Sequence, residues 1–208
     1  FMGKKDKESA EKTLGNCFVL QIIISVILTA VLLIWNRDFL MAFGASENTI
    51  SYARDYMRII LYGNVVTHMY LGLNAVLRSS GFPKMAMYAT LASVVINCAL
   101  NPLFIFGFGW GIKGSAWATV ISQVISLTGQ LIHFSRPKRL LHFKKGIYRL
   151  RSEIVKGILS IGLSPFLMNL CSCLIVILIN RGLKEHGGDM AIGAYGIVNR
   201  IAFLFVMI

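Results

Sequence analysis

The sequence predicts an all-α protein, a polytopic bundle of about six transmembrane helices. Composition is the first observation: 56% of the 208 residues are hydrophobic and 14% are charged, whereas about a quarter of a soluble domain's residues are charged. The second is a series of apolar runs near the length of about 20 residues that a helix needs to cross roughly 30 Å of hydrocarbon. Six such runs occur, at residues 15–35, 59–77, 85–106, 114–134, 158–179 and 192–208.

The distribution of Lys and Arg predicts how these runs are oriented. None of the runs has the short apolar core, basic flank and small-residue cleavage site of a signal peptide. If each run crosses once, fourteen basic residues lie on one side, six lie on the other, and Arg200 lies inside the last run. The positive-inside rule makes the first side cytoplasmic. We therefore expect cytoplasmic loops at residues 1–14, 78–84 and 135–157.

The charge also limits the partners of the chain. The net charge of +12 comes from these loops and does not form the basic face of a soluble fold that nucleic-acid binding requires, so no nucleic-acid partner is expected. The most basic loop, residues 136–156, is interpreted as a solvated linker that touches anionic headgroups. The cysteines do not suggest a disulfide framework or a transition-metal site, and no cofactor is predicted.

Polar side chains align along one face of several predicted helices, at about 100° per residue. In the run at residues 114–134 they occupy about 100° of arc, and in the run at residues 85–106 they occupy about 80°. Run by run, the aligned residues are Cys17, Gln21, Ser25 and Thr29; Asn64, Thr67, His68, Asn74 and Arg78; Thr90, Ser93, Asn97 and Asn101; and Ser115, Thr119, Ser122, Gln123, Ser126, Gln130 and His133.

Two interpretations of these faces stand side by side. Small and hydroxylated residues let membrane helices pack closely and form hydrogen bonds. Amides and imidazoles at mid-span are harder to satisfy in a dry interface, and they favour a hydrated central cavity. Because a cavity walled by helix faces is where a transporter holds its substrate, the sequence predicts a transporter. The residues expected to line its cavity are Asn64, His68, Gln123, Gln130 and Asn169.

The ionisable residues leave three questions open. All nine acidic residues fall in loops or at the ends of runs, although ion-coupled transport usually uses a carboxylate within the membrane. Arg200 either reaches the membrane interface or forms an intramembrane ion pair with a carboxylate on another helix. His68 is either a packing residue or a proton-responsive group in the cavity. The chain has no H-E-x-x-H motif, intramembrane acid pair or G-x-S-x-G motif, so an enzyme is not predicted.

Four segments resemble the multidrug and toxic compound extrusion (MATE) family, and their order and spacing make the resemblance specific. They are GKKDKESAEK at residues 3–12, LGLNAVLRSSGFPKMAMYATL at residues 71–91, INCALNPLFIFGFGWGIKGSAWATVISQ at residues 96–123 and AYGIVNRIAFLFVM at residues 194–207. The resemblance implies a transporter of twelve helices in two six-helix lobes, of which this chain is an internal portion that spans the third to eighth helices. The other helices of the full-length transporter would then be partners of this chain.

On that plan the chain divides into three parts. Residues 1–134 form part of the N-terminal lobe, with a cytoplasmic loop and four transmembrane helices. Residues 135–157 are the basic cytoplasmic linker between the lobes. Residues 158–208 start the C-terminal lobe with two transmembrane helices, the second truncated. Pro165 lies inside the first of these helices, where a proline kinks the helix and frees a carbonyl.

The resemblance also implies an activity and a site. Similar proteins exchange Na⁺ or H⁺ for organic, often cationic, drugs by alternating access across the cell membrane, here expected to be a bacterial inner membrane. In some members a cation site uses an acid on the first helix, an Asn and a carboxylate four residues apart on the fifth helix, and a Thr on the sixth. The last three positions correspond to Asn97, Asn101 and Thr119. This chain has an amide at Asn101, where those members have a carboxylate. The alternative function is flipping of lipid-linked oligosaccharides by a transporter of the same superfamily.

Overall fold

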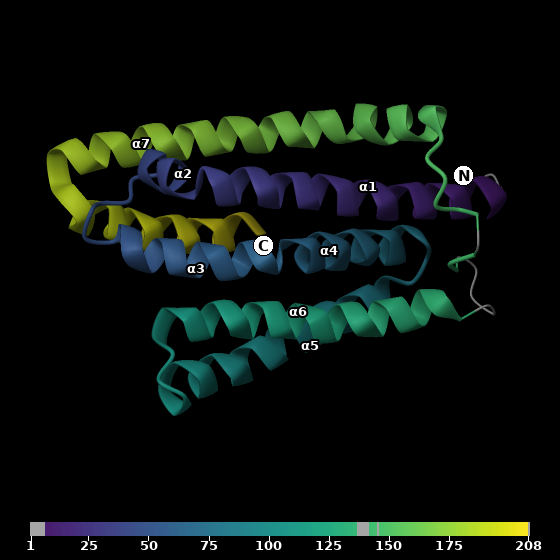
Figure 1. Cartoon of the computed structure of the whole chain (residues 1–208), viewed down its shortest axis with the longest axis horizontal. Coiled ribbons are helices and arrows are strands. Elements are labelled where there is room, and N and C mark those ends of the chain that lie inside the picture. Colours follow the sequence, from purple (N-terminus) through teal and green to yellow (C-terminus); the bar gives the residue numbers. More distant parts are fainter. Residues whose placement is uncertain (1–6, 137–141, 145, 208) are drawn as a thin grey trace. The chain divides into compact units, whose positions relative to one another are not determined.

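The computed structural model describes residues 7–136, 142–144 and 146–207. Over these residues every regular element is a helix, which confirms the predicted all-α class. The expected loop at residues 1–14 and the linker at residues 135–157 lie partly outside the described residues. In chain order the elements are α1 (Lys7–Ile34), α2 (Asn36–Ala42), α3 (Ile50–Tyr62), α4 (Asn64–Ser79), α5 (Pro83–Pro102), the π-helical turn η2 (Leu103–Gly107), α6 (Gly111–Ser135) and α7 (Ser152–Met207) (Figure 1).

The predicted apolar runs correspond to these helices. Among the described residues, three helical stretches are long and apolar enough to cross a membrane, Glu8–Ile34, Pro83–Gly107 and Ser152–Ala202. The pair α3 and α4 passes the same test as one span bent by 55°. Helix α6 has the length, 25 residues, but its polar face makes it less apolar. The described residues of the last two predicted runs both lie within α7.

Two helices are interrupted where a residue cannot continue the α-helix. In α7, Gly188 has φ 60° and ψ −159°, a backbone conformation that favours glycine, so the two predicted runs meet there at a break. In α5, Pro102 has no N–H to donate to the preceding turn. The chain continues there as η2, which ends at Gly107. Helix α6 then begins at Gly111, which has positive φ, as does Gly109 in the short turn before it.

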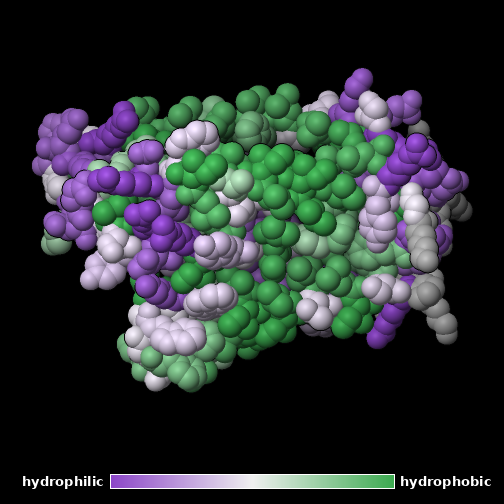
Figure 2. All heavy atoms as spheres, in the orientation of Figure 1, coloured by the Kyte–Doolittle hydropathy of each residue, from purple (hydrophilic) through white to green (hydrophobic). Residues whose placement is uncertain are grey.

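The chain folds as two compact units, which are described separately. The first unit contains Phe1–Ile34 and Asp55–Ile161, and the second contains Trp35–Arg54 and Gly162–Ile208. This division crosses the lobe boundaries that the sequence predicts, and the lobes stay a prediction. Along individual helices, Figure 2 shows long stretches covered by hydrophobic side chains, with hydrophilic ones gathered near the ends. Such surfaces suit helices that face hydrocarbon.

Helix α4 is central to the first unit, because it contacts α1, α5 and α6. Two glycines let it approach its neighbours closely. A Cβ added at Gly63 would lie 2.5 Å from Val120 of α6, and one added at Gly72 would lie 1.7 Å from the Gln21 amide of α1. The apolar core of this unit consists of Ala10, Leu14, Tyr70, Leu73, Leu77, Ala86, Leu127 and Phe134.

The described part of the basic linker contacts α1 through a few residues, while most of its side chains stay exposed. Asn16, which is fully buried, donates to the carbonyl of Arg149 (3.3 Å) and accepts from the N–H of Arg151 (2.8 Å). At Gly15 an added Cβ would lie 2.3 Å from the Ile147 carbonyl oxygen, so only glycine fits beneath the linker. We call these residues, together with Glu11 and Lys144, the linker clasp.

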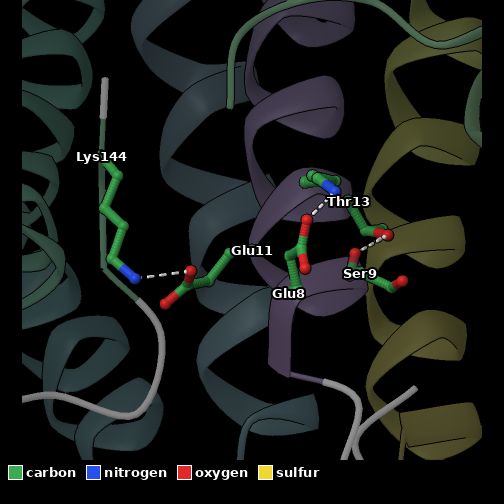
Figure 3. A network of polar contacts seen from close by, with 6 residues as sticks. Glu8, Ser9, Glu11, Thr13 and Lys144 are labelled. Atoms are coloured by element: carbon green, nitrogen blue, oxygen red, sulfur yellow. Dashed lines mark hydrogen bonds and ion pairs between the residues drawn. The ribbon is translucent and has the colours of Figure 1, made fainter. Parts of the chain in front are cut away.

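A buried carboxylate holds the other end of the clasp. The side chain of Glu11 is 7% exposed, and Lys144 Nζ lies 2.9 Å from one of its oxygens (Figure 3). His142 Nδ1 lies 3.7 Å from the other oxygen. Phe143 packs edge-on against Phe18 of α1, with ring centroids 5.1 Å apart. The linker is basic in composition, but its few apolar side chains and one acid on α1 fix its path.

Candidate ion and substrate site

Helices α5 and α6 bring together the three residues that the sequence predicts for a cation site. Asn97 Nδ2 donates to the Thr119 hydroxyl at 3.3 Å, and Asn101 Nδ2 donates to Asn97 Oδ1 at 2.8 Å. The Thr119 hydroxyl in turn donates to the Ser115 carbonyl at 3.0 Å, one turn earlier in α6. The residues lie on facing sides of consecutive helices, so the short turn at residues 107–111 suffices to pair them.

This cluster has an unused acceptor. Asn101 Oδ1 is buried and has no hydrogen-bond partner among the described residues. A buried amide oxygen without a donor is costly, by about 1–3 kcal/mol, and amide and hydroxyl oxygens are ligands for hard cations such as Na⁺. No group of three or more His, Cys, Asp or Glu that could hold a metal ion occurs in the part of the chain that the structure describes. The cluster thus offers neutral oxygens and no carboxylate.

A second polar contact lies between α4 and α6. The Thr67 hydroxyl donates to Gln123 Oε1 at 2.6 Å and also contacts the Gly63 carbonyl at 3.2 Å. Gln123 is thereby held against α4, four residues beyond Thr119 on α6. Both side chains are half-buried. This contact joins α4 to α6 one helical turn beyond Thr119.

Asn64 is engaged with α1. Its Nδ2 lies 3.2 Å from the Ser25 carbonyl and 3.1 Å from the Thr29 hydroxyl, and Ser25 is fully buried. This is the helix-packing role that the sequence left open for the polar faces. Its predicted contact with a cavity stays a prediction. Thr67, Ser25 and Thr29 were not singled out as site residues, although all three belong to the aligned polar faces.

The other predicted cavity residues lie apart from the cluster. Gln130 is 2% exposed, and neither of its amide atoms has a hydrogen-bond partner among the described residues. His68 is half-buried on α4. In the second unit, Asn169 is exposed and donates to the Pro165 carbonyl at 2.8 Å, within its own helix. Arg200 is exposed as well, and none of the ion pairs found among the described residues includes it.

The network around Asn74 shows what a fully satisfied polar group in this bundle looks like. Its Nδ2 donates to the Ala86 carbonyl at 2.9 Å and to the Thr90 hydroxyl at 3.2 Å, while Arg78 donates to its Oδ1 at 3.0 Å. Every atom of this amide is used, so Asn74 joins α4 to α5 as a structural residue. Asn101 and Gln130 differ from it in having amide atoms without partners among the described residues.

The described helices are apolar over long stretches, and polar side chains meet between α4, α5 and α6, as helices of membrane transporters do. The comparisons with known proteins agree: a family model described as MatE matches residues 1–103. The chain belongs to the multidrug and toxic compound extrusion family. Members of this family are transporters, which confirms that the chain is not part of an enzyme.

Relatives of known sequence carry names that refer to drug resistance and export. The chain is 30% identical over 211 residues to "Probable multidrug resistance protein YoeA" of Bacillus subtilis (strain 168), an alignment that covers 96% of this chain and 44% of that protein. It is 28% identical over 180 residues to "Multidrug export protein MepA" of Staphylococcus saprophyticus, covering 86% and 40%. The chain therefore spans less than half of the length of these relatives.

Solved structures show the same fold. The structure described as "Inward-facing conformation of a multidrug resistance MATE family transporter of the MOP superfamily" superimposes with a TM-score of 0.91 at 25% identity. The match covers 99% of this chain and 47% of that one. The described helices are thus those of about half a MATE transporter.

Proposed function

We propose that the complete transporter containing this chain exports organic, often cationic, drugs from a bacterial cell across the inner membrane. The names of its relatives support export of several drugs. Export against a gradient needs an energy source, and we propose exchange for Na⁺ or H⁺ by alternating access. The coupling ion is here a substrate of the transporter.

The observation that carries the ion-coupling proposal is the cluster of Asn97, Asn101 and Thr119. It combines three oxygen-bearing side chains on two helices with one buried acceptor, Asn101 Oδ1, that has no partner in the described part of the chain. Neutral oxygens bind a hard cation well only when a carboxylate supplies charge. We therefore propose that the cluster forms part of the ion site and that helices outside this chain supply the acid.

The polar contact between Thr67 and Gln123 supports an adjoining substrate cavity. The linking hydrogen bond of 2.6 Å holds the amide between α4 and α6, next to the proposed ion site. An uncharged wall suits a cationic drug better than a pyrophosphate, which is bound by Arg and Lys side chains. This favours drug export over the flipping of lipid-linked oligosaccharides.

The test is a comparison of two fluxes by the complete transporter in proteoliposomes. We expect ethidium to be expelled when an inward Na⁺ or H⁺ gradient is imposed, and to stay when the gradient is dissipated. A fluorescent lipid-linked oligosaccharide should not change leaflets faster than in protein-free liposomes. Transfer of the lipid without movement of ethidium would replace the proposed cargo with the alternative one.

A further inference from the structure

A turn after α2 is fastened to α7 by three polar contacts within the second compact unit. Asn180 Nδ2 donates to the Phe43 carbonyl at 2.7 Å, and Lys184 Nζ donates to the Ala45 carbonyl at 2.8 Å. The Ser46 hydroxyl donates to Asp189 Oδ2 at 2.6 Å. The joined residues are 137 to 143 positions apart in the sequence. We call this set of contacts the outer latch.

The turn is shaped to make these contacts. Gly44 has φ +103°, which a residue with a side chain rarely adopts, and a Cβ at this position would lie 3.1 Å from the Asn180 Cβ. The next residues are fixed locally, because the Ser46 N–H donates to the Thr49 hydroxyl at 2.9 Å. The turn therefore presents two main-chain carbonyls and one hydroxyl as a preformed surface.

The break in α7 supplies the other half of the latch. Asn180 and Lys184 lie one turn apart on the first part of α7, so both side chains reach the same side of the helix. Asp189 follows the non-helical Gly188. Asn180 is 8% exposed, while the contacts of Ser46 with Asp189 are exposed.

The chemistry of the latch differs from that of a permanent interface. It consists of hydrogen bonds, whose net contribution is small because water competes for the same groups, and two of the three acceptors are main-chain carbonyls that water can also satisfy. An obligate contact between helices buries apolar side chains, as the core around Leu73 and Leu77 does in the first unit. Three hydrogen bonds, two of them part-buried and one exposed, can break and re-form within a working cycle.

The position of the latch gives it a role. The turn belongs to the part of the chain that the sequence assigns to the first lobe, and residues 180–189 belong to the part assigned to the second. In the topology that the Lys and Arg distribution predicts, both belong to the side opposite the basic cytoplasmic loops. We propose that the outer latch is a gate contact that must open once in each transport cycle to release cargo at the outer face. This inference rests on the proposed function.

A reversible cross-link across the latch tests the inference in the complete transporter. In a background in which all cysteines are serine, Ser46→Cys is combined with Asp189→Cys, and ethidium efflux is measured after oxidation and again after reduction. We expect oxidation to lower the efflux rate at least about tenfold, because a fixed gate permits no turnover, and dithiothreitol to restore it. Full cross-linking that leaves efflux within twofold of the reduced protein would overturn the proposal.

The matched control uses the same residue and the same chemistry within the turn. The Ser46 and Thr49 hydroxyls lie 3.1 Å apart, so Ser46→Cys with Thr49→Cys cross-links the turn to itself and leaves α7 free. We expect this pair to export ethidium equally well when oxidised and when reduced. Equal inhibition of both pairs would assign the effect to stiffening of the turn and would also overturn the proposal.

A labelling experiment keeps the proposal testable without any cargo. In Gln123→Cys, reaction with a membrane-impermeant maleimide from the outer side reports the fraction of molecules whose outer face is open. Combining Asn180→Ala with Lys184→Met removes two latch hydrogen bonds and should raise the labelling rate about tenfold. Unchanged labelling would contradict the latch. If the transporter without a cross-link fails to export ethidium, but the two latch substitutions still raise the labelling rate, only the proposed cargo is contradicted.

Discussion

Asn101 donates a hydrogen bond to Asn97 across one turn of α5, with 2.8 Å between Nδ2 and Oδ1. The direction of this bond leaves Asn101 Oδ1 as a buried acceptor without a partner among the described residues. Asn97 meanwhile turns its own Nδ2 toward Thr119, at 3.3 Å. The three side chains are therefore ordered by their mutual hydrogen bonds, and the oxygen at the end of the chain of bonds is the one available to an ion.

Asn101→Asp should strengthen ion binding. The substitution keeps the shape of the side chain and replaces Nδ2 with a second oxygen, which gives up the hydrogen bond to Asn97 Oδ1 and adds a negative charge that attracts a cation directly. We expect the ion concentration for half-maximal ethidium efflux to fall about tenfold, equivalent to about 1.4 kcal/mol. The measurement is efflux against Na⁺ concentration, and against pH, in proteoliposomes. An unchanged ion dependence, with Asn101→Leu also unchanged, would remove Asn101 from the site.

Gly15→Ala should destabilise the protein through the linker clasp. The added Cβ would lie 2.3 Å from the Ile147 carbonyl oxygen, and a main-chain atom cannot swing aside as a flexible side chain can. Overpacking of this kind costs about 1–3 kcal/mol. Gly129→Ala is the matched control, because a Cβ there meets nothing within 4 Å. Thermal unfolding in detergent should show a lower midpoint for Gly15→Ala only, and equal midpoints would argue against the docked linker.

Asn16→Ala should release the linker to proteases. It leaves the N–H of Arg151 and the carbonyl of Arg149 without their buried partner, at a cost of about 1–3 kcal/mol for each group. We expect trypsin to cleave after Arg149 or Arg151 about tenfold faster than in the parent. Thr128→Ala serves as the control, since its hydroxyl is exposed and bonds only within α6. Equal cleavage rates of the two variants would contradict the proposal that Asn16 holds the linker against α1.

Asn64→Leu should separate packing from substrate binding. The amide donates to the Ser25 carbonyl and to the Thr29 hydroxyl of α1, and hydrogen bonds of this kind between membrane helices are worth about 0.6–2 kcal/mol. We expect a lower unfolding midpoint and an unchanged ethidium concentration for half-maximal efflux. A weaker apparent affinity for ethidium at unchanged stability would instead assign Asn64 to the cavity.

The sequence alone predicted those features that depend on residues close together in the chain. Apolar runs of membrane length predict helices because the backbone must satisfy its own hydrogen bonds in hydrocarbon. The pairing of Asn97 with Thr119 was predictable for a similar reason, since their helices are consecutive, each has its polar residues on one face, and a short turn joins them. The break at Gly188 was foreseen only as a gap between two apolar runs.

Contacts between distant segments could not be predicted from one sequence. Asn16 and Arg151 are 135 positions apart, and nothing in the composition of a basic loop indicates that Ile147 and His142 are buried. The choice between packing and cavity for Asn64 depends on which face of α1 it meets, and helical periodicity does not give that. For Arg200 the sequence allowed an ion pair, and among the described residues the structure shows none.

Thr119 offers the most direct test of the proposed ion site, because α6 contains a matched control. Thr119 and Thr128 both donate to a carbonyl four residues earlier, at 3.0 Å and 2.8 Å, but only Thr119 also accepts from Asn97. The measurement is ethidium efflux against ion concentration for Thr119→Ala and Thr128→Ala in the complete transporter. The proposed ion site predicts that Thr119→Ala needs about tenfold more ion for half-maximal efflux, while Thr128→Ala matches the parent. The same ion dependence in both variants would contradict it.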